Sequence, residues 1–233
     1  MLRAAYSRSP ASWPKPTIDA GVEFVELGLA PKPSFPADNP WSKEKEALGH
    51  ALFFDGRLSG TGQMACASCH DSMLGFGDGR TTSLGDGAVA LARNAPSILN
   101  SAFSAHLFWD GRAASLEDQA LAVLQNSREM ATSGDAVVAK LASSQGYRKL
   151  FAAAFGDPMP SLPHTLQAIA TFERVQASDR SSAFDRFLSG KGDALSDAQV
   201  RGLHLFRTKA RCVNCHHGPL FTDGQFHDLG LSY

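Results

Sequence analysis

The sequence predicts an all-α fold. Apolar residues recur at helical spacing in several segments, as at Leu162, Leu166 and Ile169, and no series of segments alternates apolar and polar residues as strands do. Two segments, 66–70 and 212–216, read Cys-x-x-Cys-His, the sequence to which a c-type haem attaches covalently. We therefore expect two c-type cytochrome-like haem domains built from helices, the second of them incomplete in this chain.

The two motifs contain all the cysteines of the chain, which are Cys66, Cys69, Cys212 and Cys215. In a c-type site both thiols bond to the porphyrin and the following histidine ligates the iron, so His70 and His216 are the expected proximal ligands. The alternative is a redox or zinc-binding Cys-x-x-Cys with a chance histidine after it. A zinc ribbon needs its two pairs about 15–20 residues apart, whereas these pairs lie in different halves of the chain.

Length and charge narrow the class of protein. A chain of 233 residues forms one or two domains, and a formal net charge of -1 disfavours nucleic acid or an anionic membrane as a partner. No apolar stretch approaches the roughly 20 residues of a membrane-spanning helix. Because c-type haem is ordinarily attached outside the cytoplasm, we expect a periplasmic protein. Residues 1–18 contain no apolar core of a signal peptide, so we expect that one was removed or that the natural start lies upstream.

Proline is frequent in residues 1–41, which we interpret as an extended arm that wraps a domain surface, with a disordered leader as the alternative for residues 1–15. Apolar spacing and serine capping signals predict helices at 43–54, 115–124, 135–143, 145–155, 162–177, 181–188 and from 196 onward. A glycine turn at 190–193 marks the expected boundary between two haem domains, 42–190 and 191–233.

Two further stretches need an interpretation. Residues 71–93 form a glycine-rich loop, which is either mobile or passes close to a flat cofactor. A phosphate cradle is disfavoured because no Gly-Lys-Ser/Thr is present and no strand precedes the loop. Only residues 217–233 follow His216. Since a c-type haem domain needs several helices to cover both haem faces, we expect the chain to be a fragment.

Several segments carry a resemblance to a known family. In order they are LFFDGRLSGTG (52–62), CASCH (66–70), RNAPSILN (93–100), FWDGRAASLEDQA (108–120), GLHLFRTKARCVNCHHGPLFTDG (202–224) and FHDLGL (226–231). From about residue 40 onward the chain thus resembles the bacterial dihaem cytochrome c peroxidase family, which includes MauG-type enzymes. The resemblance implies that domain 42–190 is peroxidatic and reduces hydrogen peroxide to water. It also implies an electron-transfer domain, truncated here to 191–233, that receives electrons from a small donor such as a cytochrome c or cupredoxin.

The resemblance also assigns roles to single residues. Trp109 looks like the tryptophan placed between the haems, and Glu129 and Gln119 look like the carboxylate and amide of the peroxide pocket. Asn94 resembles a ligand of a structural calcium ion whose other ligands would lie beyond Tyr233. Taken alone, Glu129 and Gln119 would be interpreted as surface residues and Trp109 as a core residue. General acid–base help of the kind a carboxylate gives is worth about 10²–10⁴-fold in rate.

The chain departs from the family at one point. In many of these peroxidases a histidine on the glycine-rich loop ligates the oxidised first haem and leaves on activation. That position aligns here with Asp86, and residues 71–105 contain no histidine. Aspartate is a poor ligand for low-spin iron, and alone Asp86 would be interpreted as a solvated loop residue. We therefore predict a first haem that is five-coordinate or water-bound without reductive activation.

Three functions follow from the sequence. The first is a peroxidase with two covalently bound haem c groups and, by resemblance, one calcium ion. The second is a MauG-type oxidase that modifies residues of a partner protein; a tyrosine as sixth ligand of the second haem would favour it, and a methionine the peroxidase. The third is a non-catalytic dihaem electron carrier, which an open first iron disfavours. Family members are often dimers, so a homodimer remains an alternative, although the sequence gives no interface signal.

Overall fold

The computed structural model describes residues 2–230. These residues form two compact units. One contains residues 33–177, and the other combines the N-terminal residues up to Lys32 with the residues from Ser178 onward. Both units are helical, and β-structure in the described part of the chain is limited to isolated bridges. The predicted all-α class is therefore confirmed.

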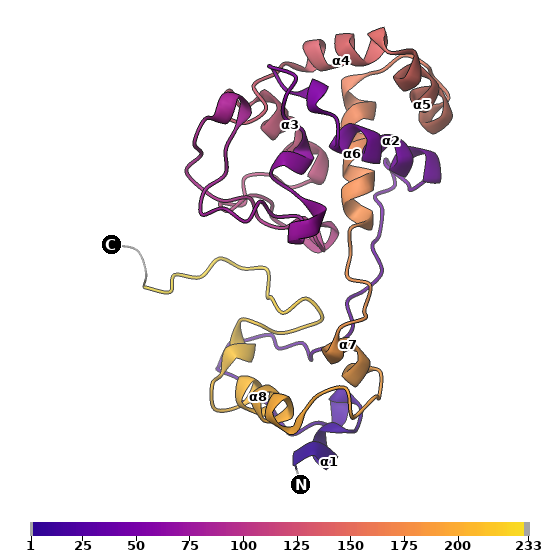
Figure 1. The fold of residues 1–233 in the computed structure, drawn as a ribbon. Helices are drawn as coiled ribbons and strands as arrows, with labels where there is room; N and C mark the ends of the chain where they lie inside the picture. Colours follow the sequence, from indigo (N-terminus) through magenta and orange to yellow (C-terminus); the bar gives the residue numbers. More distant parts are fainter. Residues whose placement is uncertain (1, 231–233) are drawn as a thin grey trace. The chain divides into compact units, whose positions relative to one another are not determined.

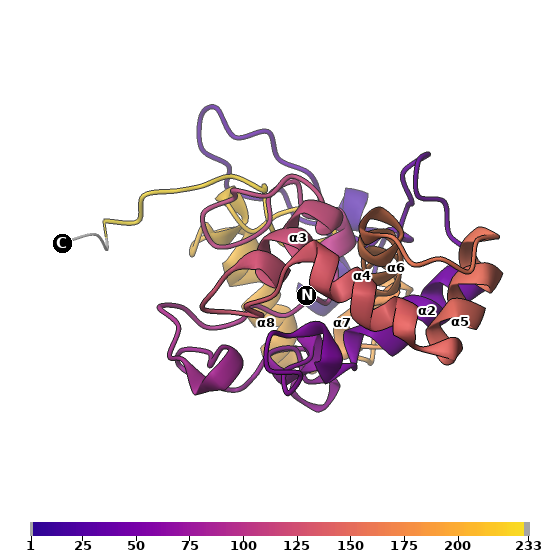
Figure 2. The same cartoon turned by 90° about the horizontal axis from the view of Figure 1, so that it is seen from above.

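Unit 33–177 is built around one long helix. Its α-helices are α2 (Lys43–Phe53), α3 (Leu116–Gln125), α4 (Gly134–Ser143), α5 (Gln145–Phe155) and α6 (Leu162–Val175). Short 3-10 helices lie between α2 and α3, at η2 (Gly56–Leu58), η3 (Cys66–Ser68), η4 (Ser72–Leu74), η5 (Asp86–Ala88) and η6 (Ser101–Phe103). Helix α6 contacts α2, α3 and α4, and α2 runs across it (Figure 1 and Figure 2).

A serine cap begins each α-helix of this unit. The serine Oγ accepts a hydrogen bond from the backbone N–H three residues later, which satisfies one of the free donors at the helix start. The capping serines are Ser42, Ser115, Ser133, Ser144 and Ser161. These short-range signals explain why the predicted helix starts agree closely with the observed ones.

Helices α2 and α6 approach closely at Gly49. A Cβ atom at this position would lie 1.9 Å from the carbonyl oxygen of Ala168 and 2.9 Å from Cβ of Phe172. Glycine in the middle of a helix lowers helix stability by roughly 1 kcal/mol relative to alanine. Gly49 therefore lowers the intrinsic stability of α2, but its lack of a Cβ atom allows α2 and α6 to pack closely.

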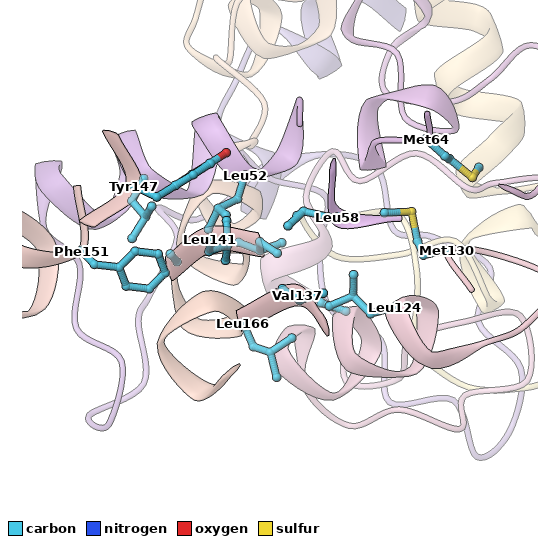
Figure 3. Close-up of a cluster of buried hydrophobic side chains, with 14 residues drawn as sticks. Leu52, Leu58, Met64, Leu124, Met130, Val137, Leu141, Tyr147, Phe151 and Leu166 are labelled. Carbon is cyan, nitrogen blue, oxygen red and sulfur yellow. The ribbon is translucent and has the colours of Figure 1, made fainter. Parts of the chain in front are cut away.

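The apolar core of unit 33–177 runs from these helices to the loop that carries the first haem motif. Figure 3 shows Tyr147 and Phe151 toward one end of the core and the sulfur atoms of Met64 and Met130 toward the other. Met64 and Met130 are 8% and 2% exposed. At this end of the core, the flexible and polarisable side chains of Met64 and Met130 therefore pack next to the haem motif.

The other unit is formed by both ends of the chain. Its helices are α1 (Leu2–Tyr6), η1 (Pro10–Ser12), α7 (Ala183–Leu188), α8 (Asp197–Arg207) and η7 (Cys212–Asn214). The core packs Tyr6, Trp13 and Leu27 against Phe187, Leu195 and Val200. At the start of α8, Ser196 and Gln199 form the capping box that the sequence predicted.

Arg207 is the centre of polar contacts in this unit. Its side chain is fully buried and pairs with Glu26. It also donates to the carbonyl oxygen of Pro14 at 2.7 Å, and its guanidinium lies 5.2 Å from the ring centroid of Trp13. A buried cation needs such partners. The segment around Trp13 is therefore packed, and a disordered leader over residues 1–15 is wrong for the described part of this segment.

The unit boundaries differ from those expected at 41/42 and 190/191. The structure divides the chain after Lys32 and again after Ala177. Trp13 contacts the ring of Phe187 at a centroid distance of 6.1 Å, so α7 belongs with the N-terminal arm. Contacts between segments so far apart in sequence leave no local signal.

A bilayer requires a membrane-spanning helix to be both long and apolar. None of the described helices in residues 2–230 combines the necessary length with the necessary apolar character.

Candidate functional site

A cavity of about 480 Å³ lies in unit 33–177. Its wall combines the first Cys-x-x-Cys-His motif with the loop that follows it, with α3 and with α6. The site residues that the sequence predicted in this part of the chain all line the cavity, namely Cys66, Cys69, His70, Asn94, Trp109, Gln119 and Glu129. Cofactor pockets of roughly 300–1,000 Å³ are typical.

His70 is held in the form that binds a metal. Its Nδ1 lies 3.0 Å from the carbonyl oxygen of Phe76, which can only accept, so Nδ1 donates and Nε2 keeps its lone pair. The pKa of His70 is lowered, mainly by burial, and this favours the neutral imidazole. Phe76 adopts a left-handed backbone conformation, with φ of 59°, which turns its carbonyl back toward the ring. A neutral imidazole with a fixed tautomer is suited to ligate iron.

The second motif repeats this arrangement in the other unit. The backbone N–H of His216 donates to the carbonyl oxygen of Cys212 at 2.8 Å. In the first motif the backbone N–H of His70 donates to the carbonyl oxygen of Cys66 at 3.0 Å. Nδ1 of His216 lies 3.1 Å from the carbonyl oxygen of Phe221, which is also left-handed with φ of 56°. The sequence analysis missed this shared device, although a phenylalanine five or six residues after each motif histidine was visible in the sequence.

The thiols of the first motif lie in surroundings that disfavour a thiolate. Burial raises the pKa of Cys66 to about 12 and also raises the pKa of Cys69. Among the described residues, the side chains grouped closely enough to hold a metal ion jointly are Cys215, Asp223 and His227. The zinc alternative therefore gains no support at the first motif, where covalent attachment of an apolar ring fits the buried thiols better.

Glu129 and Gln119 bring a carboxylate and an amide into the cavity. Gln119 lies on α3, and Glu129 lies in the turn after this helix, where its N–H donates to Asn126 at 2.9 Å. Burial raises the pKa of Glu129, and the charge of Arg112 offsets part of this effect. A half-buried carboxyl with a raised pKa holds a proton more readily than an exposed one and can return it to a bound group.

Trp109 and Asn94 are joined by a hydrogen bond at the edge of the cavity. The indole Nε1–H of Trp109 donates to the carbonyl oxygen of Asn94 at 3.0 Å. Trp109 is 55% exposed, so its interpretation as a core residue, taken alone, is wrong. Asn94 is also exposed. In this structure both residues lie at the surface of unit 33–177.

Asp86 is buried, so its interpretation as a solvated loop residue is wrong. It is 7% exposed, and its carboxylate accepts hydrogen bonds from the backbone N–H of Thr61 at 2.8 Å and from the Thr61 hydroxyl at 2.5 Å. It does not line the haem cavity. The partner lies 25 residues earlier in the chain, which local sequence patterns cannot indicate.

Glu173 is a cavity residue that the sequence analysis missed. It lies on the buried side of α6 and is 5% exposed, and its Oε2 has no hydrogen-bond partner. Burial raises the pKa of Glu173 to about 8, while the charge of Arg174 acts in the opposite direction. An unpaired buried carboxyl costs stability unless a bound group or water satisfies it. The cavity, the fixed imidazole of His70, the two thiols of the motif and this orphaned oxygen together fit a haem.

Known proteins with similar sequences bear on this fit. Residues 43–193 match the family model described as di-haem cytochrome c peroxidase. This chain belongs to the di-haem cytochrome c peroxidase family. The cofactors of this family are haem groups, and the matched residues include the first Cys-x-x-Cys-His motif.

The relatives carry two kinds of name. The chain is 44% identical over 198 residues to the methylamine utilization protein MauG of Methylophilus methylotrophus, covering 84% of this chain and 59% of that protein. It is also 44% identical over 208 residues to the cytochrome-c peroxidase IdrP1 of Pseudomonas sp. (strain SCT), covering 87% and 54%. The chain thus spans little more than half the length of these relatives.

A solved structure agrees with the fold. The crystal structure of a MauG-like protein associated with microbial copper homeostasis superposes with a TM-score of 0.75 at 34% identity. The match covers 91% of this chain and 63% of that one. The chain therefore has the helical architecture of this MauG-like protein. The sequence identities do not favour either kind of name, because the peroxidase and MauG relatives are equally similar to the chain.

Proposed function

We propose that this chain carries the peroxidatic site of a dihaem cytochrome c peroxidase. Hydrogen peroxide is reduced to water in the cavity of unit 33–177, and electrons arrive from a small redox protein through a haem attached at Cys212 and Cys215. The observation that supports this most is the placement of Glu129. A carboxyl with a raised pKa lines the same cavity as a histidine whose Nδ1 is held by a backbone carbonyl.

Two electrons from the donor protein and two protons from solvent balance the reaction. One hydrogen peroxide takes up two electrons and two protons, its O–O bond breaks, and two water molecules leave. A haem bound through Cys66, Cys69 and His70 supplies the iron at which peroxide is reduced. Glu129 accepts the proton of one peroxide oxygen and returns it to the other, and the Gln119 amide orients the peroxide by a hydrogen bond.

The remaining predicted partners belong to the same proposal. His216 would ligate a second haem, and Trp109 would assist electron transfer between the haems. Asn94 contributes a ligand to a calcium site. The protein acts in the periplasm, where haem c is attached, and a homodimer is an alternative that the resemblance alone suggests.

The test is the reaction of the intact dihaem protein with hydrogen peroxide in a stopped-flow instrument. The Glu129→Gln variant keeps the shape of the side chain and loses its proton-accepting group. The second-order rate constant should fall by about 10²–10⁴-fold. The matched control is Glu44→Gln, which changes an exposed glutamate at the start of α2 and should react as the unchanged protein does. An unaltered rate in the Glu129 variant would remove this residue from the mechanism.

A MauG-type oxidase is the second candidate, because a MauG protein is as similar to the chain as a peroxidase is. The two functions differ in where the oxidising equivalents go. A peroxidase turns over peroxide rapidly with a reduced cytochrome or cupredoxin as donor. An oxidase of the MauG type uses the oxidising equivalents to modify residues of a partner protein. Steady-state rates with reduced cytochrome c distinguish them.

A further inference from the structure

We propose that Asp86 is a positioning residue for Glu129. Its carboxylate, clamped by Thr61, holds the 83–91 loop against the main chain at Glu129, so that the glutamate stays in the cavity wall while the loop stays out of the cavity. The inference rests on the proposed function, since it assigns a residue that prepares the same site for peroxide.

The clamp uses both oxygens of the Asp86 carboxylate. Oδ2 accepts from the Thr61 backbone N–H at 2.8 Å, and Oδ1 accepts from the Thr61 hydroxyl at 2.5 Å. The hydroxyl is the main cause that lowers the pKa of Asp86, so the side chain is ionised at neutral pH. Hydrogen bonds to a buried charged acceptor are about twice as strong as neutral ones. Both oxygens of the carboxylate are therefore engaged by Thr61.

The same loop is bonded directly to the catalytic segment. The backbone N–H of Asp86 donates to the carbonyl oxygen of Glu129 at 2.7 Å, and the N–H of Gly60 donates to that of Met130 at 2.7 Å. Because Gly60 and Thr61 are neighbours, the clamp joins two segments that hold consecutive carbonyls of the 129–130 turn. A loss of the clamp loosens both supports together.

The packing leaves no room between the loop and this turn. A Cβ atom at Gly85 would lie 1.7 Å from the carbonyl oxygen of Arg128 and 3.2 Å from the Cα of Glu129. On the far side of the loop, Nη2 of Arg128 donates to the carbonyl oxygen of Ala90 at 2.7 Å. The loop is closed on itself by the N–H of Leu91, which donates to Ser83 at 2.9 Å.

This arrangement explains how Asp86 can act without touching the substrate. Ser83 and Leu91, at the base of the loop, line the haem cavity, whereas Asp86, at its tip, does not. The tip is bonded to Glu129 and to Thr61, which lies shortly before the haem attachment motif. The clamp therefore connects the segment of Glu129 to the segment that leads to His70. These hydrogen bonds do not depend on the redox state of either haem.

The experiment compares variants of the intact dihaem protein. Asp86→Asn replaces one accepting oxygen by a donor that opposes Thr61, and Thr61→Val removes the hydroxyl at constant size. Each should lower the rate constant with peroxide by roughly 10- to 100-fold, because a misplacement of about 1 Å can cost 10²-fold. Thr61→Ser keeps the hydroxyl and should restore the rate to within about threefold of the unchanged protein.

A second readout does not depend on activity. Hydrogen exchange of a peptide that covers residues 126–131 should become faster in Asp86→Asn and Thr61→Val and should remain slow in Thr61→Ser. Exchange that is unchanged in both disruptive variants would overturn the proposal. So would a normal peroxide rate in both, whatever their thermal stability.

A double variant separates the positioning role from other roles. If Asp86 acts through Glu129, then Asp86→Asn in the Glu129→Gln background should lower the rate no further. A full additional loss in that background would overturn the proposal. The proposed function fails instead if Glu129→Gln alone reacts normally, so the two failures are distinguishable.

Discussion

Substitution of Gly49 by alanine should destabilise unit 33–177, although helix propensity alone predicts the opposite. In an open helix this change adds about 1 kcal/mol to the free energy of unfolding. Here the new Cβ would lie 1.9 Å from the oxygen of Ala168, about 1.5 Å short of ordinary contact. The atom it meets belongs to the backbone of α6, which cannot rotate away.

The magnitude follows from overpacking. Forced insertion of a methyl group into a close-packed core costs about 1–3 kcal/mol and occasionally more. Because the obstacle at Gly49 is backbone, α2 and α6 must separate, and we expect the upper end of this range. After subtraction of the propensity gain, Gly49→Ala should lower the free energy of unfolding by about 2 kcal/mol.

Glycines in other helices provide matched controls. Gly146, in α5 of the same unit, is exposed, and its Cβ would meet only Ser144 Oγ at 3.6 Å. Gly202, in α8 of the other unit, has no neighbour within 4 Å. Their alanine variants should be as stable as the unchanged protein or up to about 1 kcal/mol more stable. Urea unfolding followed by helical circular dichroism and by haem absorbance measures all of them. A Gly49→Ala protein as stable as these controls would refute the packing argument.

Two further predictions concern one half-buried carboxyl and one buried carboxyl. Glu117 holds Arg174 by paired hydrogen bonds of 2.7 Å; burial alone would raise the pKa of Glu117, but these bonds lower it overall. Glu117→Ala should therefore lower the free energy of unfolding, measured in urea at pH 7, by about 3 kcal/mol. The loss should shrink as pH falls through the lowered pKa of Glu117. A loss below about 0.5 kcal/mol at pH 7 would contradict this prediction. For Glu173, whose pKa burial raises to about 8, the unfolded state ionises first, so stability should fall as pH rises from about 4.5 to 8. Glu173→Gln should flatten this dependence in pH-dependent thermal unfolding, and an identical slope in both proteins would contradict the assignment.

The parts of the fold that depend on neighbouring residues were predictable from the sequence. Serine caps such as Ser133 and Ser161 mark helix starts within one turn, and the two Cys-x-x-Cys-His motifs each specify a haem site within five residues. The cavity residues Glu129 and Gln119 came from the family resemblance, because their local context is that of surface residues.

The remaining features depend on contacts between distant segments. Trp13 packs on Phe187, and Asp86 is clamped by Thr61, although nothing near either residue in the sequence indicates its partner. Glu173 follows a run of buried α6 residues, so helical spacing assigns it to the core without showing that its carboxyl faces a cavity. Such contacts set both the unit boundaries and the arrangement of the site.

The central claim is that the first haem has an open iron position beside Glu129. The electron paramagnetic resonance spectrum of the fully oxidised intact protein tests it most directly. Since no histidine occurs in residues 71–105 and the Asp86 carboxylate is held by Thr61, we expect one high-spin ferric haem and one low-spin haem. Two low-spin signals, with none from a high-spin centre, would show a protein side chain bound opposite His70 and would contradict the account.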